Sequence, residues 1–580
     1  MNSSSRVSQR APKSYALPSP GSGDGQSEPS ETAEKSADNR HTSYLPAAGA
    51  RDESSRAGIA AEAVTSLETL VWGSHHVSSS GDLPFSAGTL CLPSDPAVDS
   101  ISIYQEHGIL GFHRDHVAWM HNVVHIPSFQ EECAKFRRTH ATPSPAWLSL
   151  YYALLSAGLY YMNEGHCQDL GIQNGHGLAR SLYWRCIDIL NSTDFLAVHS
   201  LHALQAICLL LPCAHAFGDT KRIIVLLSSA ACIAQIMQLH LLGPDPSSLC
   251  SIDDALTREI KKRVWYFLVV QDSYLITFKK AYSICMSHTT TPLPANCSEL
   301  VGELFDNGRL RTLPMSCATQ SSYAIFQIKM TAIKRWLHDE TCKSEAKQLV
   351  LADIYKKVLQ ADEDMNRLRQ DLPAWMKSAP ALEASRRDSD LVQGQRRTFR
   401  ISFAHMRLSI HRAFFCRSFT EKQYCYSHVT CLKAARLLLQ TYRGTAGEGV
   451  IDMWTVPAHV LSACIIVTLN LLLCDDTDEF EQPQDDDDEY LMRECLALLR
   501  AAEKPNQLVR RGMVMIDRLL EQKEQRTSTY VSFSNDEIVK LIQEVEGIMR
   551  GDNEIATALN ITFDEFLGFL DVDPLGYMRW

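Results

Sequence analysis

The chain has 580 residues, of which 45% are hydrophobic and 21% are charged. This balance is typical of a globular protein and excludes a wholly disordered, collagen-like or membrane-embedded chain. The 68 Asp and Glu residues outnumber the 56 Lys and Arg residues, which leaves a formal net charge of −12. Because there is no overall basic excess to hold a polyphosphate, the composition also disfavours a protein that coats nucleic acid.

The sequence contains 18 Cys and opens MNSSSRVSQR, without the charged and then apolar run of a secretory signal. We therefore expect a reducing compartment, in which thiols in apolar helical patterns are buried as small hydrophobic side chains. Examples of such thiols are Cys186, Cys208, Cys213, Cys232 and Cys464. The longest apolar run, Leu461 to Cys474, is shorter than the ~20 residues that a membrane-spanning helix needs. We expect no membrane partner.

The first part of the chain, from Met1 to about Arg56, is rich in Ser, Gly, Pro and charged residues. It has too few large apolar side chains to offset the entropy lost on ordering. A second stretch, from Gly73 to about Ser100, has isolated apolar residues among Ser, Gly and Pro. We expect a disordered arm over residues 1–100 and a helical domain over residues 101–475.

The clearest helical pattern follows Gly218-Asp219-Thr220, with Asp219 or Thr220 as the N-cap and Gly243-Pro244 as the stop. Its apolar face is formed by Ile223, Leu226, Leu227, Ala230, Ala234, Met237 and Leu241. The pattern from Leu201 to Leu211 precedes it, and the connection runs through Pro212 to Gly218. The two helices should therefore pack as an antiparallel hairpin.

Similar helical patterns recur along most of the chain. They cover Trp147–Met162, Leu178–Leu190, Thr257–Phe278, Ser322–Leu337, Ile354–Leu368, Phe399–Phe415, His428–Tyr442 and His459–Leu473. Strand-like alternation is almost absent, so the expected fold class is all-α, a large bundle of antiparallel helical hairpins. We expect two interruptions: an exposed loop over 378–395 and a disordered acidic insertion over 476–490. C-terminal helices and an acidic, aromatic tail should occupy 491–580.

Several short motifs occur in a fixed order over about residues 115–475. The landmarks are Pro127, Ser128, Phe129, Gly218, Asp219, Arg263, Trp265 and Asp272. In this order the chain resembles the regulatory "middle homology" domain of fungal-specific transcription factors. Members of that family usually have Gly-Arg-Pro after the last landmark, whereas this chain has Lys279-Lys280-Ala281. The function of that turn is therefore in doubt here.

The resemblance implies a nuclear regulator of RNA polymerase II genes, of which a metabolic or secondary-metabolite gene set is a family-level expectation. Family members usually carry a binuclear zinc cluster or paired zinc fingers before this domain. Here the first cysteine is Cys91 and no C-x2-C pair occurs, so the thiolates of such a zinc site cannot gather. Either DNA is reached through a partner, or an N-terminal DNA-binding module is missing from this sequence. A homodimer or heterodimer is compatible with both alternatives.

The C-terminal tail combines acidic and large apolar residues. A capping box at Ser534 and Glu537 predicts a helix, and an acidic, aromatic stretch follows. Its large apolar side chains are Phe563, Phe566, Leu567, Phe569 and Leu570. This composition is typical of an activation segment that docks into a transcription coactivator. A short terminal helix that packs back on the bundle is the alternative.

The sequence does not predict an enzyme, a metal site or a cofactor. It lacks a phosphate-binding loop and a nucleophile elbow. His121 and His125 could share a metal from one helical face, but Asn122 stands where a zincin needs Glu. The alternative function is a helical interaction or co-regulator protein that binds no DNA itself.

The resemblance further implies that the bundle can bind a small apolar effector. The aromatic residues that could line such a pocket are Tyr151, Tyr152, Tyr160, Tyr161, Trp265 and Tyr266. Ordinary core packing is the favoured interpretation of these side chains, because large aromatics are what helical cores are filled with.

Overall fold

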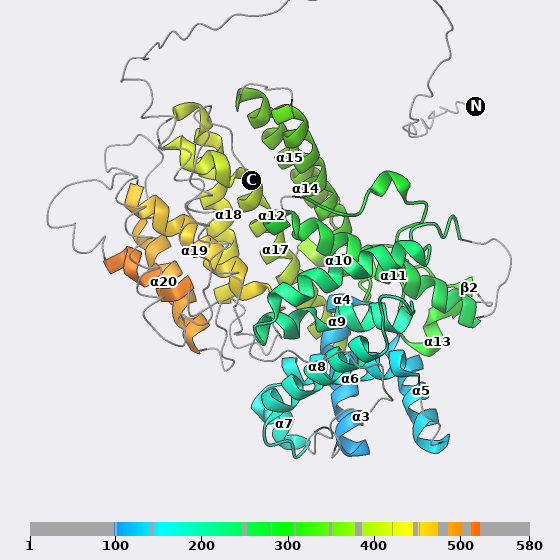
Figure 1. Ribbon diagram of the computed structural model, residues 1–580. Coiled ribbons are helices and arrows are strands. Elements are labelled where there is room, and N and C mark those ends of the chain that lie inside the picture. The colour runs from blue at the N-terminus through cyan, green and yellow to red at the C-terminus, as the bar shows by residue number, and fades with distance from the viewer. Residues whose placement is uncertain are drawn as a thin grey trace, which may run out of the picture. The chain divides into compact units, whose positions relative to one another are not determined.

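The computed structural model describes residues 98, 101–139, 144–245, 252–279, 281–306, 309–346, 351–377, 386–419, 421–444, 451, 453–473, 485–501, 512–514 and 516–521. Within these residues the chain is almost entirely helical, and the β-structure is a single pair of two-residue strands, β1 (Phe305–Asp306) and β2 (Arg309–Leu310). This confirms the all-α fold class (Figure 1). The predicted arm over residues 1–100, apart from Val98, lies outside the described residues.

The helices follow one another closely along the chain. The first half comprises α3 (Ile103–Phe112), a π-helical turn (His113–Val117), α4 (Ala118–His121), α5 (Ile126–Thr139), α6 (Pro145–Tyr161), α7 (Glu164–Asp169), α8 (Gly175–Ser192), α9 (Leu201–Ala216), α10 (Thr220–Ile236), α11 (Ile252–Tyr274) and α12 (Ile276–Lys279). The second half comprises a 3-10 turn (Met286–His288), α13 (Val301–Leu304), α14 (Ser322–Ala346), α15 (Leu351–Gln370), α16 (Ala374–Lys377), α17 (Arg386–Ser418), a second 3-10 turn (Lys422–Tyr424), α18 (Cys425–Gly444), α19 (Val456–Leu473) and α20 (Asp485–Ala501).

Helices α9 and α10 form the hairpin that the sequence predicts, and the two helices contact each other. Helix α9 continues through Pro212 as far as Ala216. Gly218 turns the chain with a φ of +81°, a conformation that glycine adopts at little cost. Helix α10 ends at Ile236, before the predicted stop at Gly243, because Gln238 takes a left-handed φ of +60° and breaks the helical path.

The longest helix, α17, begins earlier than the sequence predicts. The exposed loop expected over 378–395 is wrong for residues 386–395, which are the first turns of α17. Gln395 is fully buried and donates a hydrogen bond to the carbonyl oxygen of Thr319 at 2.8 Å. The polar sequence predicted exposure, although the amide nitrogen of Gln395 is buried and bonded to a distant backbone group.

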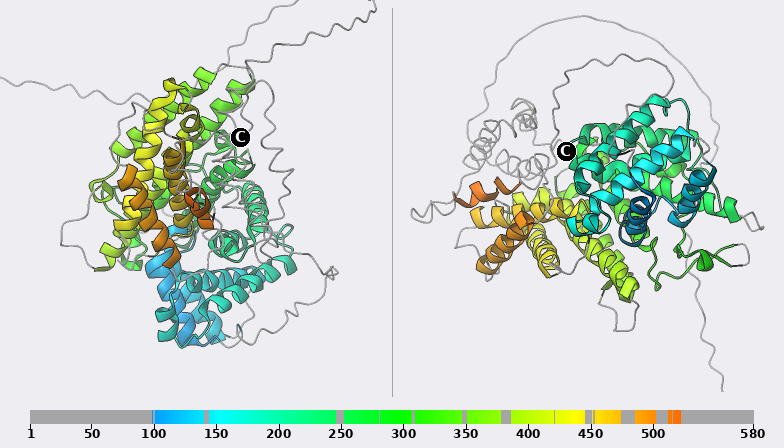
Figure 2. Two further views of the ribbon diagram at one scale, coloured as in Figure 1. Left: turned by 90° about the vertical axis from the view of Figure 1, so that its left-hand side faces the viewer. Right: turned by 90° about the horizontal axis from the view of Figure 1, so that it is seen from below.

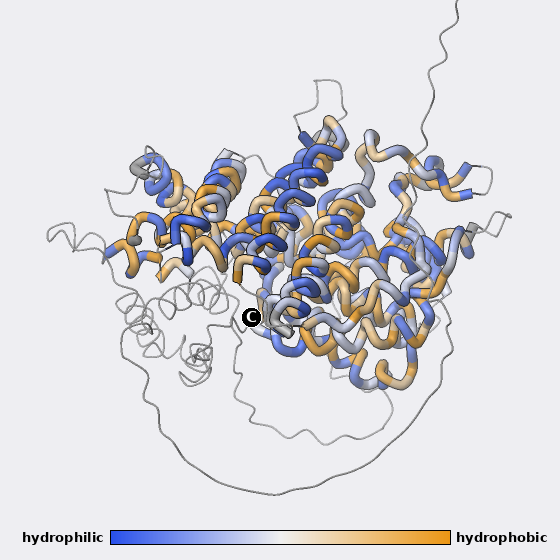
Figure 3. Tube along the Cα trace, turned by 90° about the horizontal axis from the view of Figure 1, so that it is seen from above, coloured by the Kyte–Doolittle hydropathy of each residue, from blue (hydrophilic) through white to orange (hydrophobic). Residues whose placement is uncertain are grey.

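Helix α17 contributes to two hydrophobic cores. Toward the first half of the chain it buries Phe399, Phe403, Met406, Ile410 and Phe414. On another face it buries Ile401, Ala404, Leu408 and Phe415 against α18, α19 and α20. Figure 2 shows the yellow and orange helices α18, α19 and α20 lying together. Along most helices, hydrophobic and hydrophilic residues alternate (Figure 3), as expected when each helix buries one face.

Asp362 connects α15 to α17 and α18. Its carboxylate accepts hydrogen bonds from Arg407 at 2.7 and 2.9 Å and from the Tyr426 hydroxyl at 2.7 Å. Burial alone would raise the pKa of Asp362, but the hydrogen bonds from His411 and Arg407 outweigh it and hold this pKa well below its usual value. The charged carboxylate therefore fixes three helices at one point.

The acidic run ends in a helix rather than in a solvated loop. Helix α20 begins at Asp485, so residues 485–490 of the insertion predicted over 476–490 are helical. Asp488 is buried, and its carboxylate accepts hydrogen bonds from Arg436 of α18 at 2.7 and 2.6 Å. Carboxylates in the first turns also interact favourably with the helix dipole. The preceding residues 474–484 lie outside the described residues.

Two expectations about composition can also be compared with the structure. Four of the five cysteines named above are buried, whereas Cys232 is exposed on α10. In the part of the chain that the structure describes, every helix is too short or too polar to cross a bilayer.

Candidate functional site

Helix α11 carries a cluster of buried charges built around the landmark Arg263. Its guanidinium lies 2.7 Å from the Glu299 carboxylate and 3.3 Å from that of Glu259. Lys262, also buried, lies 2.7 Å from Glu259. Burial alone would lower the pKa of Arg263, but the nearby Glu299 carboxylate raises it above its ordinary value. Two buried cations thus have two acidic partners, and we call these four residues the paired cluster.

The paired cluster holds other segments against α11. Glu259 accepts a hydrogen bond from the backbone N–H of Ala295 at 2.8 Å. Arg263 donates to the side-chain oxygen of Asn122 at 3.3 Å, and Asn122 ends α4 with a left-handed φ of +55°. The basic residues of this landmark therefore join α11 to the chain near residue 295 and to the end of α4.

Asp272 fixes the turn that follows α12. Its carboxylate accepts hydrogen bonds from the backbone N–H groups of Ser283 and Ile284, each at 2.8 Å. Arg335 of α14 lies 3.3 Å away, and Lys279 lies 3.4 Å away. Lys279 belongs to the Lys279-Lys280-Ala281 segment in which this chain departs from the family pattern. Its ammonium is a second cation beside the Asp272 carboxylate.

The remaining landmarks begin helices. Pro127, Ser128 and Phe129 lie in the first turn of α5, where the Ser128 backbone N–H donates to His125 Nδ1 at 3.3 Å and the Phe129 ring stacks on Trp147 at 5.3 Å. Asp219 precedes α10, but its side chain does not cap that helix. It accepts hydrogen bonds from the Tyr183 hydroxyl at 2.7 Å and from Arg222 at 2.8 Å.

The landmark residues do not converge on one site. Arg263 alone among them lines the cavity described below, and Trp265 is fully buried with its ring 5.5 Å from that of His240. The order of these landmarks along the sequence thus corresponds to contacts that join helices. The landmarks do not form a ligand site.

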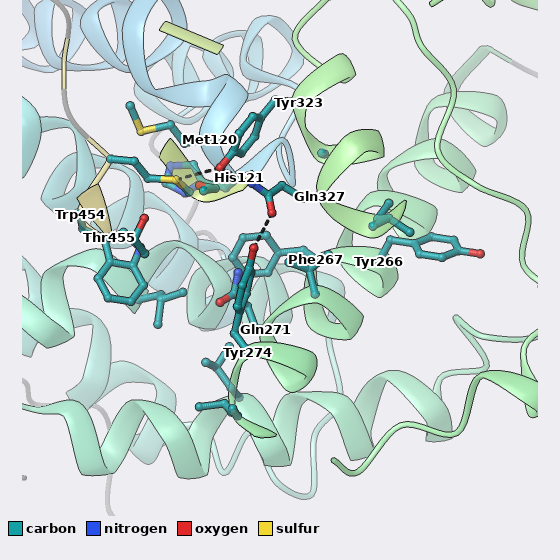
Figure 4. Close-up of a pocket in the computed structure, with 18 of the residues that line it drawn as sticks. Met120, His121, Tyr266, Phe267, Gln271, Tyr274, Tyr323, Gln327, Trp454 and Thr455 are labelled. Carbon is teal, nitrogen blue, oxygen red and sulfur yellow. Dashed lines mark hydrogen bonds between the residues drawn. The ribbon is translucent and has the colours of Figure 1, made fainter. Parts of the chain in front are cut away.

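A cavity lies between α4, α9, α10, α11, α12, α14, α17 and the residues at the start of α19 (Figure 4). Its empty space amounts to about 1340 Å³, including the part that is open to solvent. Apolar and aromatic side chains form much of the wall, among them Leu211, Ile224, Leu227, Phe267, Val270, Tyr274, Ile328 and Trp454. Cavities between helices with apolar and aromatic walls are common small-molecule sites in proteins.

A chain of hydrogen bonds crosses one wall of the cavity. The Tyr274 hydroxyl donates to Gln327 Oε1 at 2.5 Å, and Gln327 Nε2 donates to the Tyr323 hydroxyl at 2.6 Å. Tyr323 in turn contacts the sulfur of Met453 at 3.4 Å. Figure 4 shows Tyr274, Gln327 and Tyr323 pointing toward one another. Because these polar groups satisfy each other, they shape the wall without needing a ligand.

Histidines form a second polar part of the wall. His215 stacks on Trp454 with ring centroids 4.2 Å apart, and His405 stacks on His459 at 3.9 Å. Burial lowers the pKa of His215 and of His459 to about 3. It also lowers the pKa of His405 well below its usual value. These imidazoles are therefore neutral at pH 7.

Lys334 of α14 carries the cavity's unusual charge. Its ammonium donates a hydrogen bond to the Thr277 hydroxyl at 3.0 Å and lies 5.4 Å from the centre of the Tyr274 ring. Burial lowers the pKa of Lys334 to about 8. Within the described part of the chain, the cavity wall contains Arg263, Lys334 and Arg412 but no Asp or Glu.

Comparison with known proteins identifies the domain. Residues 110–390 match the family model described as the fungal specific transcription factor domain. The chain is 22% identical over 442 residues to the agnestins biosynthesis cluster transcription factor AgnL11 of Paecilomyces divaricatus, covering 72% of this chain and 61% of that relative. Residues 110–390 are a fungal specific transcription factor domain. The family consists of transcription factors, which confirms the expectation that the chain is not an enzyme.

Two further proteins resemble the chain that contains this fungal transcription factor domain. The probable transcription factor lepB of Aspergillus flavus is 21% identical over 357 residues, which cover 57% of this chain and 61% of lepB. The chain thus spans about three fifths of the length of both curated relatives. The structure titled "Structure of the K. lactis CBF3 core" aligns with a TM-score of 0.53 at 11% identity, covering 86% of this chain and 98% of that chain. This likeness concerns the fold alone.

In this fungal transcription factor domain, most of the aromatic residues considered as a pocket lining pack in the first core. Of the six, Tyr266 alone is among the residues lining the cavity, and its hydroxyl donates to the carbonyl of Thr291 at 2.8 Å. Figure 4 shows it pointing away from Tyr274 and Tyr323. Tyr160 and Tyr161 pack edge to face at 4.9 Å in the first core. Core packing, the favoured interpretation, describes most of the set.

The histidines considered as metal ligands do not share a helical face. Helix α4 ends at His121, and Asn122 turns the chain before His125. The ring of His121 stacks on His113 at 5.6 Å, and burial lowers the pKa of His121 to about 4. No cluster of three or more metal-binding side chains occurs among residues for which the structure gives positions.

Sequence reasoning missed most of the cavity. Lys334, Trp454 and His459 line the cavity, but the sequence pattern around them carried no signal of a site. Lys334 sits in the ordinary amphipathic pattern of α14, and its exposure cannot be judged without α12 and α17. His405, Arg412, Trp454 and His459 also lie beyond the matched residues 110–390. The proposed activation residues Phe563, Phe566, Leu567, Phe569 and Leu570 lie outside the described residues.

Proposed function

We propose that this protein is a nuclear regulator of transcription by RNA polymerase II. The observation that carries the proposal is the match of residues 110–390 to the fungal specific transcription factor domain. Two relatives whose names describe transcription factors support it. The absence of an overall basic excess, with a formal net charge of −12, suits a regulatory domain rather than a surface that binds DNA through charge alone.

The regulated genes are, in this proposal, a metabolic or secondary-metabolite set. The name of AgnL11 associates that relative with the agnestins biosynthesis cluster, and we extend a role of this kind to the present chain. DNA is reached either through a DNA-bound partner, which includes a second copy of the chain, or through an N-terminal module not present in this sequence. Coactivators are recruited by the acidic, aromatic segment around Phe566 and Phe569.

Chromatin immunoprecipitation of the chain tagged at its own locus, combined with transcript profiling after its deletion, tests the regulatory role. Occupancy upstream of a group of genes whose transcripts fall or rise on deletion is the expected result. Absence of both occupancy and transcript change contradicts the proposal and favours a helical interaction protein. Mapping the 5′ end of the transcript then distinguishes the two routes to DNA, because an upstream C-x2-C-x6-C exon identifies a module in the same protein.

A reporter assay tests the activation segment separately. The full chain is fused to a foreign DNA-binding domain, and the Phe566→Ala/Phe569→Ala variant is compared with Phe533→Ala, an aromatic substitution outside the segment. Loss of two large apolar side chains from a docking segment should reduce reporter output by roughly tenfold or more, as expected for hot-spot residues. Equal output from both variants contradicts the role of this segment but leaves the promoter occupancy test untouched.

A further inference from the structure

The cavity brings a half-buried cation together with an apolar wall. Lys334 projects from α14 toward Thr277 of α12 and Tyr274 of α11. It is close enough to His405 of α17 and His459 of α19 to lower the pKa of both imidazoles. The ammonium group is therefore positioned where four helices and the short α12 meet, and not on an outer helix face.

The partners of this ammonium are electrically neutral. Its hydrogen bond is to the Thr277 hydroxyl, and the ring beneath it is that of Tyr274. An ammonium has three donors, and in the described structure its side chain forms no ion pair with a carboxylate. The other titratable groups around it, His405 and His459, are neutral at pH 7 because burial lowers their pKa values. Two of its three donors are therefore available to a ligand or to water.

The contrast with the buried cations of the same domain makes this arrangement informative. Lys262 and Arg263 lie within 4 Å of Glu259, and Arg335 lies 3.3 Å from Asp272. Burying a charge is costly unless it is paired, and the half-buried Lys334 bears part of that cost without a carboxylate. An anion entering the cavity would supply the missing partner.

We propose that this cavity binds a small organic acid, in which an apolar or aromatic body packs against the Phe267, Ile224 and Leu227 side of the wall and a single carboxylate pairs with Lys334. The carboxylate replaces water around the ammonium and accepts charge-assisted hydrogen bonds from it. Arg412, which also lines the cavity from α17, is a second cation in the wall. The body of the ligand gains from leaving water, since aromatic and aliphatic side chains make up much of the wall.

The inference does not rest on the proposed function, because binding is measured on the purified chain. The probes are decanoate and 2-naphthoate, which present an aliphatic and an aromatic body with one carboxylate, and their neutral counterparts 1-decanol and 2-naphthalenemethanol. Titration calorimetry at pH 7 measures each affinity. We expect at least one acid to bind saturably and to exceed its own alcohol by about tenfold or more, as one charge-assisted hydrogen bond supplies.

Three substitutions locate the carboxylate. Lys334→Met should remove the preference for the acid over the alcohol, and Lys334→Arg should retain it. Lys329→Met is the matched control, because Lys329 is exposed on the same helix and lies over the Phe326 ring at 5.9 Å. It should leave both affinities unchanged. Circular dichroism and thermal unfolding confirm that each variant remains folded.

Proton uptake gives a readout that a purely structural lysine would not change. The pKa of Lys334 is about 8 in the empty cavity, and a carboxylate beside it must raise that pKa. Binding at pH 8.5 should therefore take up a proton, seen as a dependence of the binding heat on the ionisation enthalpy of the buffer. Lys334→Met should abolish this dependence.

Several results overturn the proposal. One is the absence of saturable binding by both acids at millimolar concentration. Another is equal affinity for acid and alcohol in the unsubstituted chain. An equal loss of affinity in Lys334→Met and Lys329→Met places the carboxylate elsewhere. None of these results affects promoter occupancy, so failure here and failure of the regulatory role are distinguishable.

Discussion

Two regions of the domain surround their cations with opposite kinds of group. In the paired cluster, Lys262 and Arg263 meet Glu259 and Glu299, so the charges are balanced within the protein. In the cavity, Lys334 meets a hydroxyl and a ring. The first arrangement holds segments of the chain together, because Glu299 and the backbone N–H of Ala295 reach the charges of α11 from another part of the structure. The second leaves a positive charge without a carboxylate, and an external anion can pair with it.

Removing a cation from the paired cluster should have the largest effect. Arg263→Met leaves Glu299 and Glu259 with an uncompensated buried negative charge. Breaking a buried ion pair in this way costs about 3–5 kcal/mol of unfolding free energy. Urea denaturation followed by circular dichroism measures the loss.

The control for this prediction is Arg367→Met on α15. Arg367 lies 3.0 Å from Asp364, and its side chain is 60% exposed. Exposed pairs contribute about 0–1 kcal/mol, so this variant should unfold close to the wild-type midpoint. If Arg263→Met unfolds there as well, the paired cluster does not stabilise the fold.

Acid should destabilise the cavity wall next most strongly. Burial lowers the pKa of His459 to about 3 and that of His121 to about 4. Between those values and 6.5 the unfolded chain binds protons that the folded chain excludes, so stability falls as pH falls. By linkage, each of these histidines lowers the free energy of unfolding by about 2 kcal/mol at pH 5 relative to neutral pH.

His459→Gln should remove the contribution of one histidine, about 2 kcal/mol, from this acid-induced loss of unfolding free energy. Thermal unfolding between pH 7 and 5 measures it, with His107→Gln, an exposed position on α3, as the control. His459 faces His405 from α17 and Lys334 from α14, so a repulsive charge appears there on protonation. Parallel stability curves for the wild type and His459→Gln contradict the prediction.

A smaller effect of opposite sign is expected for Lys334→Met. Removing a half-buried charge that lacks a carboxylate should raise stability at pH 7 by about 1 kcal/mol. The pKa of Lys334 is about 8 in the folded chain and 10.5 is its ordinary value, so the wild type gains stability as pH rises through this window and the advantage of the variant disappears. Denaturation at pH 7 and pH 10.5 measures both parts, and Lys329→Met should show neither.

The smallest effect concerns the hydroxyl that Lys334 contacts. Thr277→Val should cost about 0.5–1.5 kcal/mol in the wild type, because it removes the hydrogen bond to the ammonium. The same substitution should cost less in a Lys334→Met background, where no ammonium remains. A double-mutant cycle measures the difference. Identical costs in both backgrounds mean that the contact does not stabilise the ammonium.

Much of the fold could be predicted from local pattern. Helix α15 buries Ile354, Val358, Ala361, Met365 and Leu368, the spacing that its sequence shows. Local pattern failed for polar segments whose hydrogen-bond partners are distant in the sequence. Residues 386–395 and Asp488 look solvated in the sequence, and both are inside helices because Thr319 and Arg436 meet them.

The candidate site was harder to predict than the fold. The aromatic residues singled out in the sequence are large and close together along the chain, and most of them fill the core. The cavity instead joins residues from Met120 to His459, which approach each other only after α4, α11, α14, α17 and α19 have packed. Motif order indicated the family, but it gave no information on which side chains face the empty space.

The sequence by itself determined the all-α class, the principal helices and the family, because hydrophobic periodicity and short motifs are properties of neighbouring residues. The tertiary structure decided which cations are paired. Lys262, Arg263 and Lys334 are all basic residues in amphipathic helices, and part of their difference is local, because Glu259 precedes the first two by three and four positions. The rest arises because Glu299 approaches Arg263 from 36 positions along the chain, whereas the described groups around Lys334 are neutral. Burial and charge compensation depend on the whole fold.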